Sequence, residues 1–413
     1  MILFSHPTGN ANVRHAAEAL AEARLLQEFW TCVGWDPEAA INRLLPRKVR
    51  AELARRALPA AVRPVAHFRP WREAGRMACA RAGITSLSRH ERGPFSIDAV
   101  FRDLDRHVAR RVAKATGLTG VYAYEDGAAA TFTAARERGI ARIYDLPIGY
   151  WRAAHVIYAE EAAREPQWAC TLSGMQDSTA KLARKDEELE LADVVMVASS
   201  FTKKTIEEAP TCTAPIHVIP YGAPASADFP PDTRHGEKLR VFFAGSLGQR
   251  KGLSYLLDAV KMLGDRVELT LLGTKVSEDC APLNEALKRH HWIPSLPHAE
   301  VLREMTRHDV FVFPSLFEGF GLVLLEAMAQ GLPIITTPNT AGPDLIEDGR
   351  EGFIVPIRSA QAIVEKLDLL CGDAQLLSAM KIAAHTGARR QSWAHYRSEL
   401  SETVRRTATK TPT

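Results

Sequence analysis

The second half of this sequence alternates short, almost wholly apolar runs with longer segments of helical periodicity. The runs are rich in β-branched and aromatic residues, and each ends in glycine or a polar residue. The runs lie at residues 239–246, 267–273, 310–315 and 333–337, and the helical segments at 252–263, 299–308 and 322–330. Strands that lack polar alternation are buried on both faces, so the pattern predicts a parallel sheet covered by helices, a doubly wound α/β domain.

The first half repeats this alternation, so we predict two Rossmann-like domains. Its expected strands are residues 1–5, 120–125, 141–146, 193–200 and 216–222, and its expected helices are 13–29 and 128–139. Residues 223–238 are rich in proline, alanine and polar residues and have no periodicity, which is typical of a linker. The predicted organisation is an N-terminal domain (1–222), the linker (223–238), a C-terminal domain (239–385) and a terminal helix (386–406).

The composition favours a cytoplasmic location. The six cysteines form no C-x-x-C pair, which is typical of reduced cysteines in a cytosolic protein. The N-terminus MILFSHPTGN has no basic segment or long apolar run, so we do not expect a signal peptide. We find no run of about 18 apolar residues, the length needed to span a membrane.

The region Arg43–Arg76 is strongly basic, with ten basic and two acidic residues among interspersed leucines and valines. Two interpretations stay open. One is a solvated arginine-rich helical face, and the other is a surface that meets an anionic acceptor or anionic lipid, with the protein peripheral at the inner face of the cytoplasmic membrane. No nucleic-acid motif accompanies the charge, so no nucleic-acid partner is expected.

Two strand ends of the C-terminal half carry glycine with polar residues. In GSLGQRKG (245–252) the strand ends at Gly245 and Ser246, and Arg250 and Lys251 precede a helix. Two cations beside free helix N–H groups suit a pyrophosphate, although a solvated surface turn has the same composition. The loop after the next strand places Thr274 at the same edge, where an ordinary turn is an equal alternative.

The third strand end carries two isolated carboxylates, Glu318 and Glu326, in SLFEGFGLVLLEAMAQG. Gly319 and Gly321 let the backbone approach a ligand at the expected helix start. Glu318 lies before that start, and the side chain of Glu326 leans back toward it. Carboxylates accept hydrogen bonds from hydroxyls, so the pair can bracket a phosphate between two sugars, as in a nucleotide sugar. A helix-start carboxylate with an exposed one at the rim is the structural alternative.

The E-x₇-E pattern inside PSLFEGFGLVLLEAMAQGLPII resembles the signature of retaining family-4 glycosyltransferases, which have the GT-B fold. Further pieces agree in order: DVVMVASSFTKKTI, VIPYGAPASADF, AGSLGQRKGLSYLLDAV, HDVFVFPS, AGPDLIEDGREGFIVP and SWAHYRSEL. The resemblance is strong from about residue 190 to 395. It implies two Rossmann-like domains that face a cleft, with the terminal helix crossing back to the N-terminal domain.

The resemblance also implies a hexosyltransferase-type enzyme that moves a sugar from a nucleotide-sugar donor to a glycan, lipid-linked or small-molecule acceptor, with retention. Glu318 would contact the donor sugar, and Glu326 the ribose. Backbone amides of Phe320, Gly321 and Leu322 would face sugar and phosphate. Arg250 and Lys251 would neutralise the leaving pyrophosphate. Ser246 stands where many members have arginine. No cofactor, and no metal for the chemical step, is expected.

The N-terminal domain gives weaker expectations. In FSHPTGNANV, Gly9 matches the loop that faces the donor, and Asn10 and Asn12 can bond acceptor hydroxyls, although an ordinary turn fits as well. Pro147 stands where members often carry a histidine, and the nearby polar alternatives on the acceptor side are Glu125, Asp126 and Asp145.

Three further interpretations complete the prediction. Asp103-Leu104-Asp105 has the D-x-D form of a metal–nucleotide motif, but it lies in a helical pattern, and we expect an exposed helix surface. A catalytically silent sugar-nucleotide-binding or scaffold protein and a sugar-nucleotide epimerase on the same fold remain the alternatives to a transferase.

Overall fold

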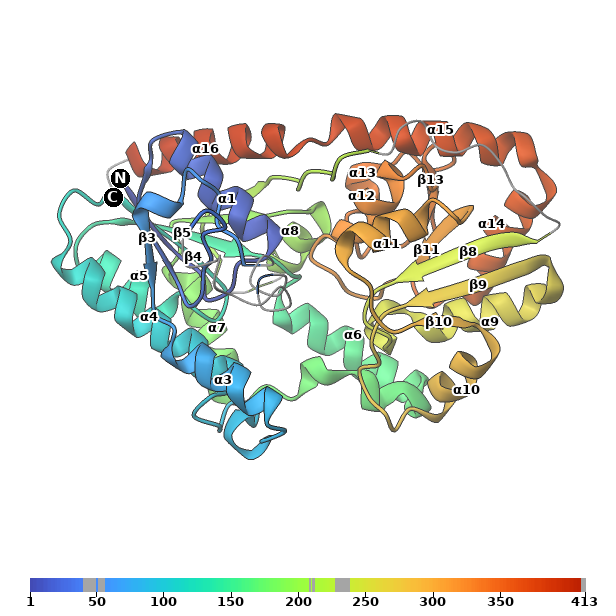
Figure 1. Cartoon of the computed structure of the whole chain (residues 1–413), viewed down its shortest axis with the longest axis horizontal. Helices are drawn as coiled ribbons and strands as arrows, with labels where there is room; N and C mark the ends of the chain where they lie inside the picture. Colours follow the sequence, from blue (N-terminus) through green and yellow to red (C-terminus); the bar gives the residue numbers. More distant parts are fainter. Residues whose placement is uncertain (40–49, 51–55, 208, 210–211, 227–237, 410–413) are drawn as a thin grey trace.

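The computed structural model describes residues 1–39, 50, 56–207, 209, 212–226 and 238–409, which form two α/β domains (Figure 1). The first domain has a seven-stranded sheet in the order β3-β2-β1-β4-β5-β6-β7. The second has a six-stranded sheet in the order β10-β9-β8-β11-β12-β13. The paired strands of both sheets run parallel, so the doubly wound prediction is confirmed.

The elements of the first domain alternate strand and helix for most of their length. The strands are β1 (Ile2–Ser5), β2 (Leu26–Thr31), β3 (Ala66–Phe68), β4 (Gly120–Tyr124), β5 (Ala141–Leu146), β6 (Val194–Val197) and β7 (Ile216–Val218). The helices are α1 (Ala11–Glu22), α3 (Trp71–Arg81), α4 (Ile97–Lys114), α5 (Ala129–Arg136), α6 (Trp151–Arg164), α7 (Thr179–Leu191) and α8 (Ser200–Glu207).

The second domain follows the same plan and ends in three helices. The strands are β8 (Leu239–Ala244), β9 (Val267–Leu272), β10 (His291–Ile293), β11 (Val310–Phe313), β12 (Ile334–Thr336) and β13 (Gly352–Ile354). The helices are α9 (Leu253–Leu263), α10 (Ala281–Arg289), α11 (His298–Met305), α12 (Leu322–Ala329), α13 (Gly342–Leu345), α14 (Ala360–Gly372), α15 (Ala374–Arg390) and α16 (Trp393–Thr409). Strands β1, β4 and β11 are buried along their whole length, as expected for a sheet covered on both faces.

One predicted element is wrong. The helix expected over 13–29 ends at Glu22, and β2 begins at Leu26. Arg24 adopts a left-handed conformation (φ +57°) that turns the chain between them. Strand β2 then pairs in parallel with β1 and buries Phe29 in the core, a tertiary gain that outweighs the helix propensity of the segment.

The predicted linker lies between the sheets, but its residues 227–237 fall outside the described part of the chain. The first sheet ends at Val218 and the second begins at Leu239. At the near end of the linker, Ala223 forms a bridge with Ser392, just before α16.

Helix α6 ties the two domains together (Figure 1). Its Glu161 is completely buried and accepts three hydrogen bonds from the second domain. The donors are Gln249 Nε2 at 2.6 Å, Tyr255 OH at 2.8 Å and Arg358 Nε at 2.7 Å. A buried carboxylate is stable only with such partners, so this contact fixes α6 against the second domain.

Helices α15 and α16 run along one side of both domains (Figure 1). Helix α15 packs against α12, and α16 packs against α1. Arg397 of α16 pairs with Glu18 at 3.2 Å and Glu22 at 3.1 Å, while Tyr396 is buried beside Tyr221. The last helix therefore returns to the first domain and helps to close its core.

Candidate functional site

A cavity of about 550 Å³ opens between the two domains. Its first-domain wall consists of Asn10, Asn12, Pro147 and Tyr221. Its second-domain wall consists of Ala244, Gly245, Ser246, Arg250, Lys251, His298, Val301, Phe313, Glu318, Phe320, Gly321, Leu322, Val323 and Glu326. A larger cavity of about 930 Å³ lies elsewhere, beside the start of β9, and neither Glu318 nor Glu326 lines it. Ligands of doubly wound sheets bind at the carboxyl ends of the strands, which favours the interdomain cavity.

The start of α12 supplies backbone donors to this cavity. Gly321 takes a left-handed conformation (φ +84°) immediately before the helix, and Leu322 and Val323 follow in the lining. The first N–H groups of a helix have no intrahelical acceptor and carry the positive end of the helix dipole. This end of α12 is therefore suited to an anion.

The loop before α12 is held in place by the first domain. A side chain at Gly319 would overlap the carbonyl oxygen of Pro147, so this close approach requires glycine. The carbonyl oxygen of Gly319 accepts hydrogen bonds from Ser199 Oγ and, at 2.9 Å, from Thr202 Oγ1. Both domains thus determine the position of the glutamate next to it.

Glu318, Arg250 and Lys251 form one ion cluster, in which Glu318 and Lys251 are buried and Arg250 is partly exposed. Arg250 Nη1 and Lys251 Nζ both donate to Oε1 of Glu318, and Arg250 Nη1 also donates to the carbonyl oxygen of Phe317 at 3.1 Å. Burial alone would raise the pKa of Glu318, but the two cations hold it below its ordinary value. Burial lowers the pKa of Lys251 to about 8. Two cations and one carboxylate thus lie at the cavity wall.

Glu326 lies within α12, whereas Glu318 lies on the loop before this helix. Glu326 has a partner that we did not expect from the sequence. His298 Nε2 lies 2.9 Å from Glu326 Oε1. This hydrogen bond raises the pKa of His298 above its ordinary value despite partial burial. Sequence reasoning missed His298, because it belongs to α11 and no local pattern connects it to Glu326.

The N-terminal loop contributes less than we expected from its sequence. Asn10 caps α1 by accepting from the Val13 N–H at 3.1 Å, which is a structural role, although it also lines the cavity. Asn12 Nδ2 donates to Tyr221 OH at 3.1 Å, inside the cavity wall. Gly9 and Thr274 are absent from the cavity lining that the structure describes.

Asp145 lies beneath the first-domain wall rather than in it. It is buried and accepts a hydrogen bond from Tyr122 OH at 2.5 Å. Burial raises the pKa of its carboxyl group to about 7. Asp145, which we expected on the acceptor side, is therefore part of a buried pair with Tyr122.

This pair predicts a pH dependence of stability. The pKa of this carboxyl group is higher in the folded than in the unfolded protein. The free energy of unfolding therefore falls as the pH rises from about 4 to 7. Asp145→Asn stays neutral, so its melting temperature should exceed that of the wild type increasingly from pH 5 to pH 8. Asp279→Asn, at an exposed position, should follow the wild type. Parallel profiles for wild type and Asp145→Asn would contradict the prediction.

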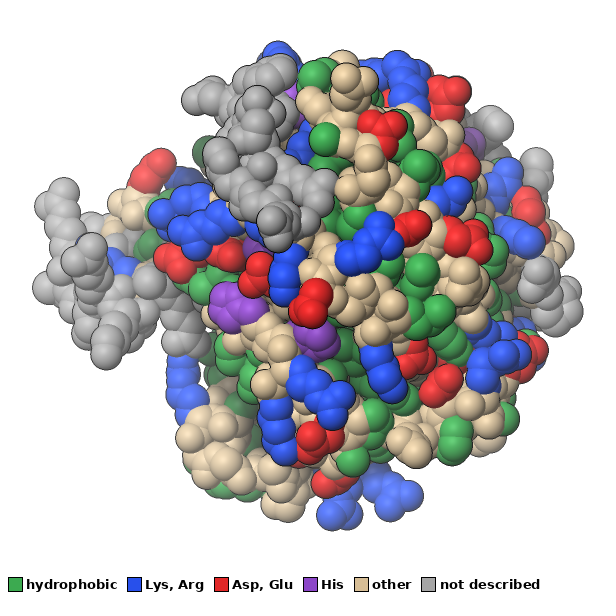
Figure 2. Space-filling model, turned by 90° about the vertical axis from the view of Figure 1, so that its right-hand side faces the viewer, with side chains coloured by type: hydrophobic (Ala, Val, Ile, Leu, Met, Phe, Trp, Pro, Cys, Tyr) green, Lys and Arg blue, Asp and Glu red, His purple; other side chains and the backbone are tan. Residues whose placement is uncertain are grey.

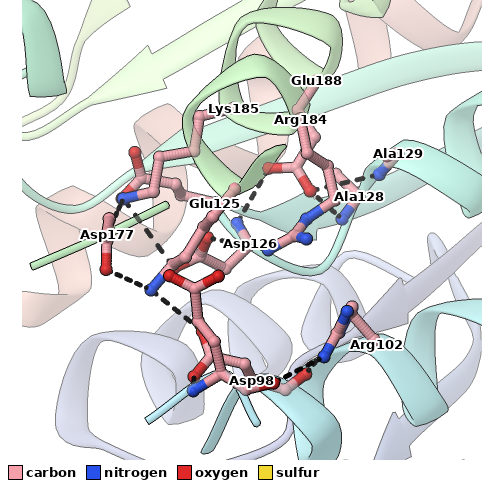
Figure 3. A network of polar contacts seen from close by, with 12 residues as sticks. Asp98, Arg102, Glu125, Asp126, Ala128, Ala129, Asp177, Arg184, Lys185 and Glu188 are labelled. Carbon is pink, nitrogen blue, oxygen red and sulfur yellow. Dashed lines mark hydrogen bonds and ion pairs between the residues drawn. The ribbon is translucent and has the colours of Figure 1, made fainter. Parts of the chain in front are cut away.

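Glu125 and Asp126 belong to a polar network at the end of β4 (Figure 3). Glu125 is 3.3 Å from Lys185 Nζ, and Asp126 is 3.5 Å from Arg184, both on α7. Burial raises the pKa of Glu125 to about 6. In the same network Glu188 accepts from the N–H groups at the start of α5. These contacts hold the end of β4 and the start of α5 against α7, and neither acceptor candidate lines the interdomain cavity.

The D-x-D segment is not an exposed helix surface. Asp105 is buried and accepts from the Ala130 and Thr131 N–H groups at 2.9 and 2.8 Å, so it caps α5. Asp103 accepts from Arg69 and Trp71 at 3.0 Å each. The expectation was wrong because the helix dipole of α5 and the neighbouring arginine provide partners that the local pattern cannot show.

Part of the basic region Arg43–Arg76 lies outside the described residues, namely 43–49 and 51–55. Within the described part, Arg56 and Arg76 pair with Glu73, and Arg69 and Arg72 pair with Asp103. Figure 2 shows one face of the molecule, on which basic and acidic side chains are interspersed. Each of these two carboxylates is shared by two arginines, so the four positive charges are only partly offset.

His6, at the end of β1, is a second histidine that sequence reasoning missed. It is buried, its ring lies 4.7 Å from that of Tyr124, and its Nδ1 accepts from the Thr8 N–H at 3.0 Å. Burial lowers its pKa to about 4, so it is neutral at pH 7. A histidine directly after a buried strand was the available signal.

One group of described residues brings three side chains that could ligate a metal close together. The ligand atoms of His90, Glu91 and Asp177 lie within 4.8 Å of one another. Lys181 Nζ already lies 2.9 Å from Asp177 and from Asp98, so the protein itself supplies a cation there.

Among the helices described, none is long and apolar enough to cross a membrane.

Two parallel-sheet domains, a cleft at their strand ends and a helix returning to the first domain define the GT-B fold. Sucrose-phosphate synthase from Thermosynechococcus elongatus superposes with a TM-score of 0.65 over 98% of both chains at 16% identity. Anabaena HepE in complex with UDP and glucose superposes with a TM-score of 0.62 over 98% of this chain and 99% of that chain, also at 16% identity.

Sequence comparison finds a family model that matches the second domain. Residues 226–386 match the family model of glycosyl transferases group 1. The capsular polysaccharide biosynthesis glycosyltransferase CapM of Staphylococcus aureus is 26% identical over 220 residues, 48% of this chain and 56% of that protein. The matches to three curated relatives span 37, 56 and 34% of those relatives' lengths.

Proposed function

We propose that this protein is a glycosyltransferase that moves a sugar from a nucleotide sugar to a glycan, lipid-linked or small-molecule acceptor, with retention at the anomeric carbon. One observation carries the proposal. In a domain of the glycosyl transferases group 1 family, the interdomain cavity brings together two cations, two carboxylates and the N-terminus of α12. Diphosphate and sugar hydroxyls need this combination of donors and acceptors.

Each part of the cavity wall has a proposed role. Glu326, oriented by His298, accepts from the ribose hydroxyls, and Glu318 serves the transferred sugar. Arg250 and Lys251, with the first amides of α12, bind the diphosphate and stabilise the negative charge that develops on it as it leaves. Asn12 and Tyr221 face them across the cavity, on the acceptor side. The chemical step is proposed to use no metal ion.

The relatives suggest which substrates to try first. HepE was crystallised with UDP and glucose on the same fold, so uridine nucleotide sugars are the first donors to test. CapM acts in capsular polysaccharide biosynthesis, which favours a glycan acceptor. Contact with an anionic membrane surface remains a prediction about where the acceptor is met.

Thermal unfolding tests the donor site. Wild type and Glu326→Ala are melted with UDP, GDP, ADP, TDP and CMP and with their common sugars. A ligand at about 100 times its dissociation constant stabilises the folded state by roughly 2.7 kcal/mol, which corresponds to a shift of several degrees. We expect a shift with one nucleotide in the wild type and its loss in Glu326→Ala. No shift with any nucleotide would contradict the proposal.

A catalytically silent sugar-nucleotide-binding protein is the second candidate. The observation that favours it is Ser246, which stands where many members of the family that this sequence resembles carry an arginine. Release of the nucleoside diphosphate from a bound donor, measured with extracts that contain acceptors, separates the two. Binding without release would support the silent protein.

A further inference from the structure

Glu318 already binds the two cations that the donor diphosphate needs. Arg250 and Lys251 donate to the same oxygen, Oε1 of Glu318. The side chains of Glu318 and Lys251 are 11 and 9% exposed, so water screens this contact poorly. In this arrangement the carboxylate of Glu318 occupies the position beside the two cations that the donor diphosphate would take.

The position of the cluster is fixed from both sides. Leu316 N–H and Ser315 Oγ donate to the carbonyl oxygen of Arg250 at 2.9 and 3.0 Å, which ties the two loops together. The ammonium of Lys251 lies 4.7 Å from the ring centre of Phe313. Both loops are thereby held, so the carboxylate and the two cations stay within reach of one another at the cavity wall.

We propose that Glu318 is a built-in counter-ion, which must release Arg250 and Lys251 before a donor diphosphate can bind. This inference rests on the proposed function of the same cavity. A nucleotide sugar offers the released carboxylate new partners, the hydroxyls of its sugar. A nucleoside diphosphate lacks these hydroxyls. The released carboxylate then stays buried beside the diphosphate without a new hydrogen-bond donor, which is unfavourable. Glu318 thereby favours the donor over the diphosphate product and promotes release of that product.

Pyrophosphate is the probe that isolates this effect, since it has neither base nor sugar. Glu318→Gln keeps the shape of the side chain and removes its charge. We expect it to bind pyrophosphate at least about tenfold more tightly than the wild type, by isothermal titration calorimetry, the ratio that one pKa unit of interaction represents. Glu285→Gln, the matched control at an exposed carboxylate of α10 outside this cavity, should bind pyrophosphate as the wild type does. Equal or weaker binding by Glu318→Gln would overturn the proposal.

The wild type provides a second measurement that needs no variant. The proposal predicts that it binds its nucleotide sugar more tightly than the corresponding nucleoside diphosphate, and that the difference shrinks or reverses in Glu318→Gln. A wild type that binds the diphosphate more tightly overturns the inference. If the wild type binds no nucleotide sugar at all, the proposed function fails instead. If it binds the nucleotide sugar but Glu318→Gln gains no affinity for pyrophosphate, only the counter-ion role fails.

Discussion

Replacing Lys251 with methionine should lower the rate of sugar transfer by roughly 10²- to 10³-fold, the usual effect of removing one charge-stabilising donor from an active site. Lys251 is buried at the cavity wall, where its ammonium can meet the leaving diphosphate. Methionine keeps an apolar stem of similar length against Phe313, so the loss would reflect the charge. Release of the nucleoside diphosphate at saturating donor measures the rate.

The matched control for this variant is Lys261→Met. Lys261 lies on α9, is exposed, and is remote from the interdomain cavity. It should turn over at the wild-type rate. A folded Lys251→Met protein with an unchanged rate would show that the charge of Lys251 does not act in the chemical step.

The second large effect concerns stability. Glu161→Ala should lower the free energy of unfolding by roughly 3–5 kcal/mol, because removing this buried charged partner takes a hydrogen-bond acceptor from three groups at once. Those groups are Gln249, Tyr255 and Arg358 of the second domain. Urea unfolding, followed by fluorescence, measures the change.

Its neighbour Glu160 is the natural control. Glu160 also pairs with Arg358, at 2.8 Å, but its side chain is 58% exposed. Exposed ion pairs contribute about 0–1 kcal/mol, so Glu160→Ala should be nearly neutral. If both variants lost the same stability, the three contacts of Glu161 would not be the cause.

The parts of the fold that the sequence predicted are those with a strong local signal. The apolar runs that became β8, β9, β11 and β12 are buried on both faces, so their composition alone indicates a covered parallel sheet. Strand β2 was missed because residues 13–29 are rich in helix-forming residues. Its identity depends on pairing with β1, which lies outside any local window.

The candidate site divides in the same way. Glu318, Arg250 and Lys251 follow strand ends, so topology alone brings them to one edge, and the structure places them in contact. The partnership of Glu326 with His298 joins two helices that no spacing rule relates. Burial beneath the cavity wall also separates Asp145 from the lining residues, and an amino-acid pattern does not reveal the depth of a side chain.

The return of α16 to α1 has a consequence for the order of synthesis on the ribosome. Leu400 and Val404 are buried in the first domain, yet they are translated only after the whole second domain. The nascent first domain must therefore leave the exit tunnel with an uncovered apolar face and wait, exposed to chaperones and to aggregation. The two domains consequently cannot mature one after the other, because the core of the first is completed only by α16.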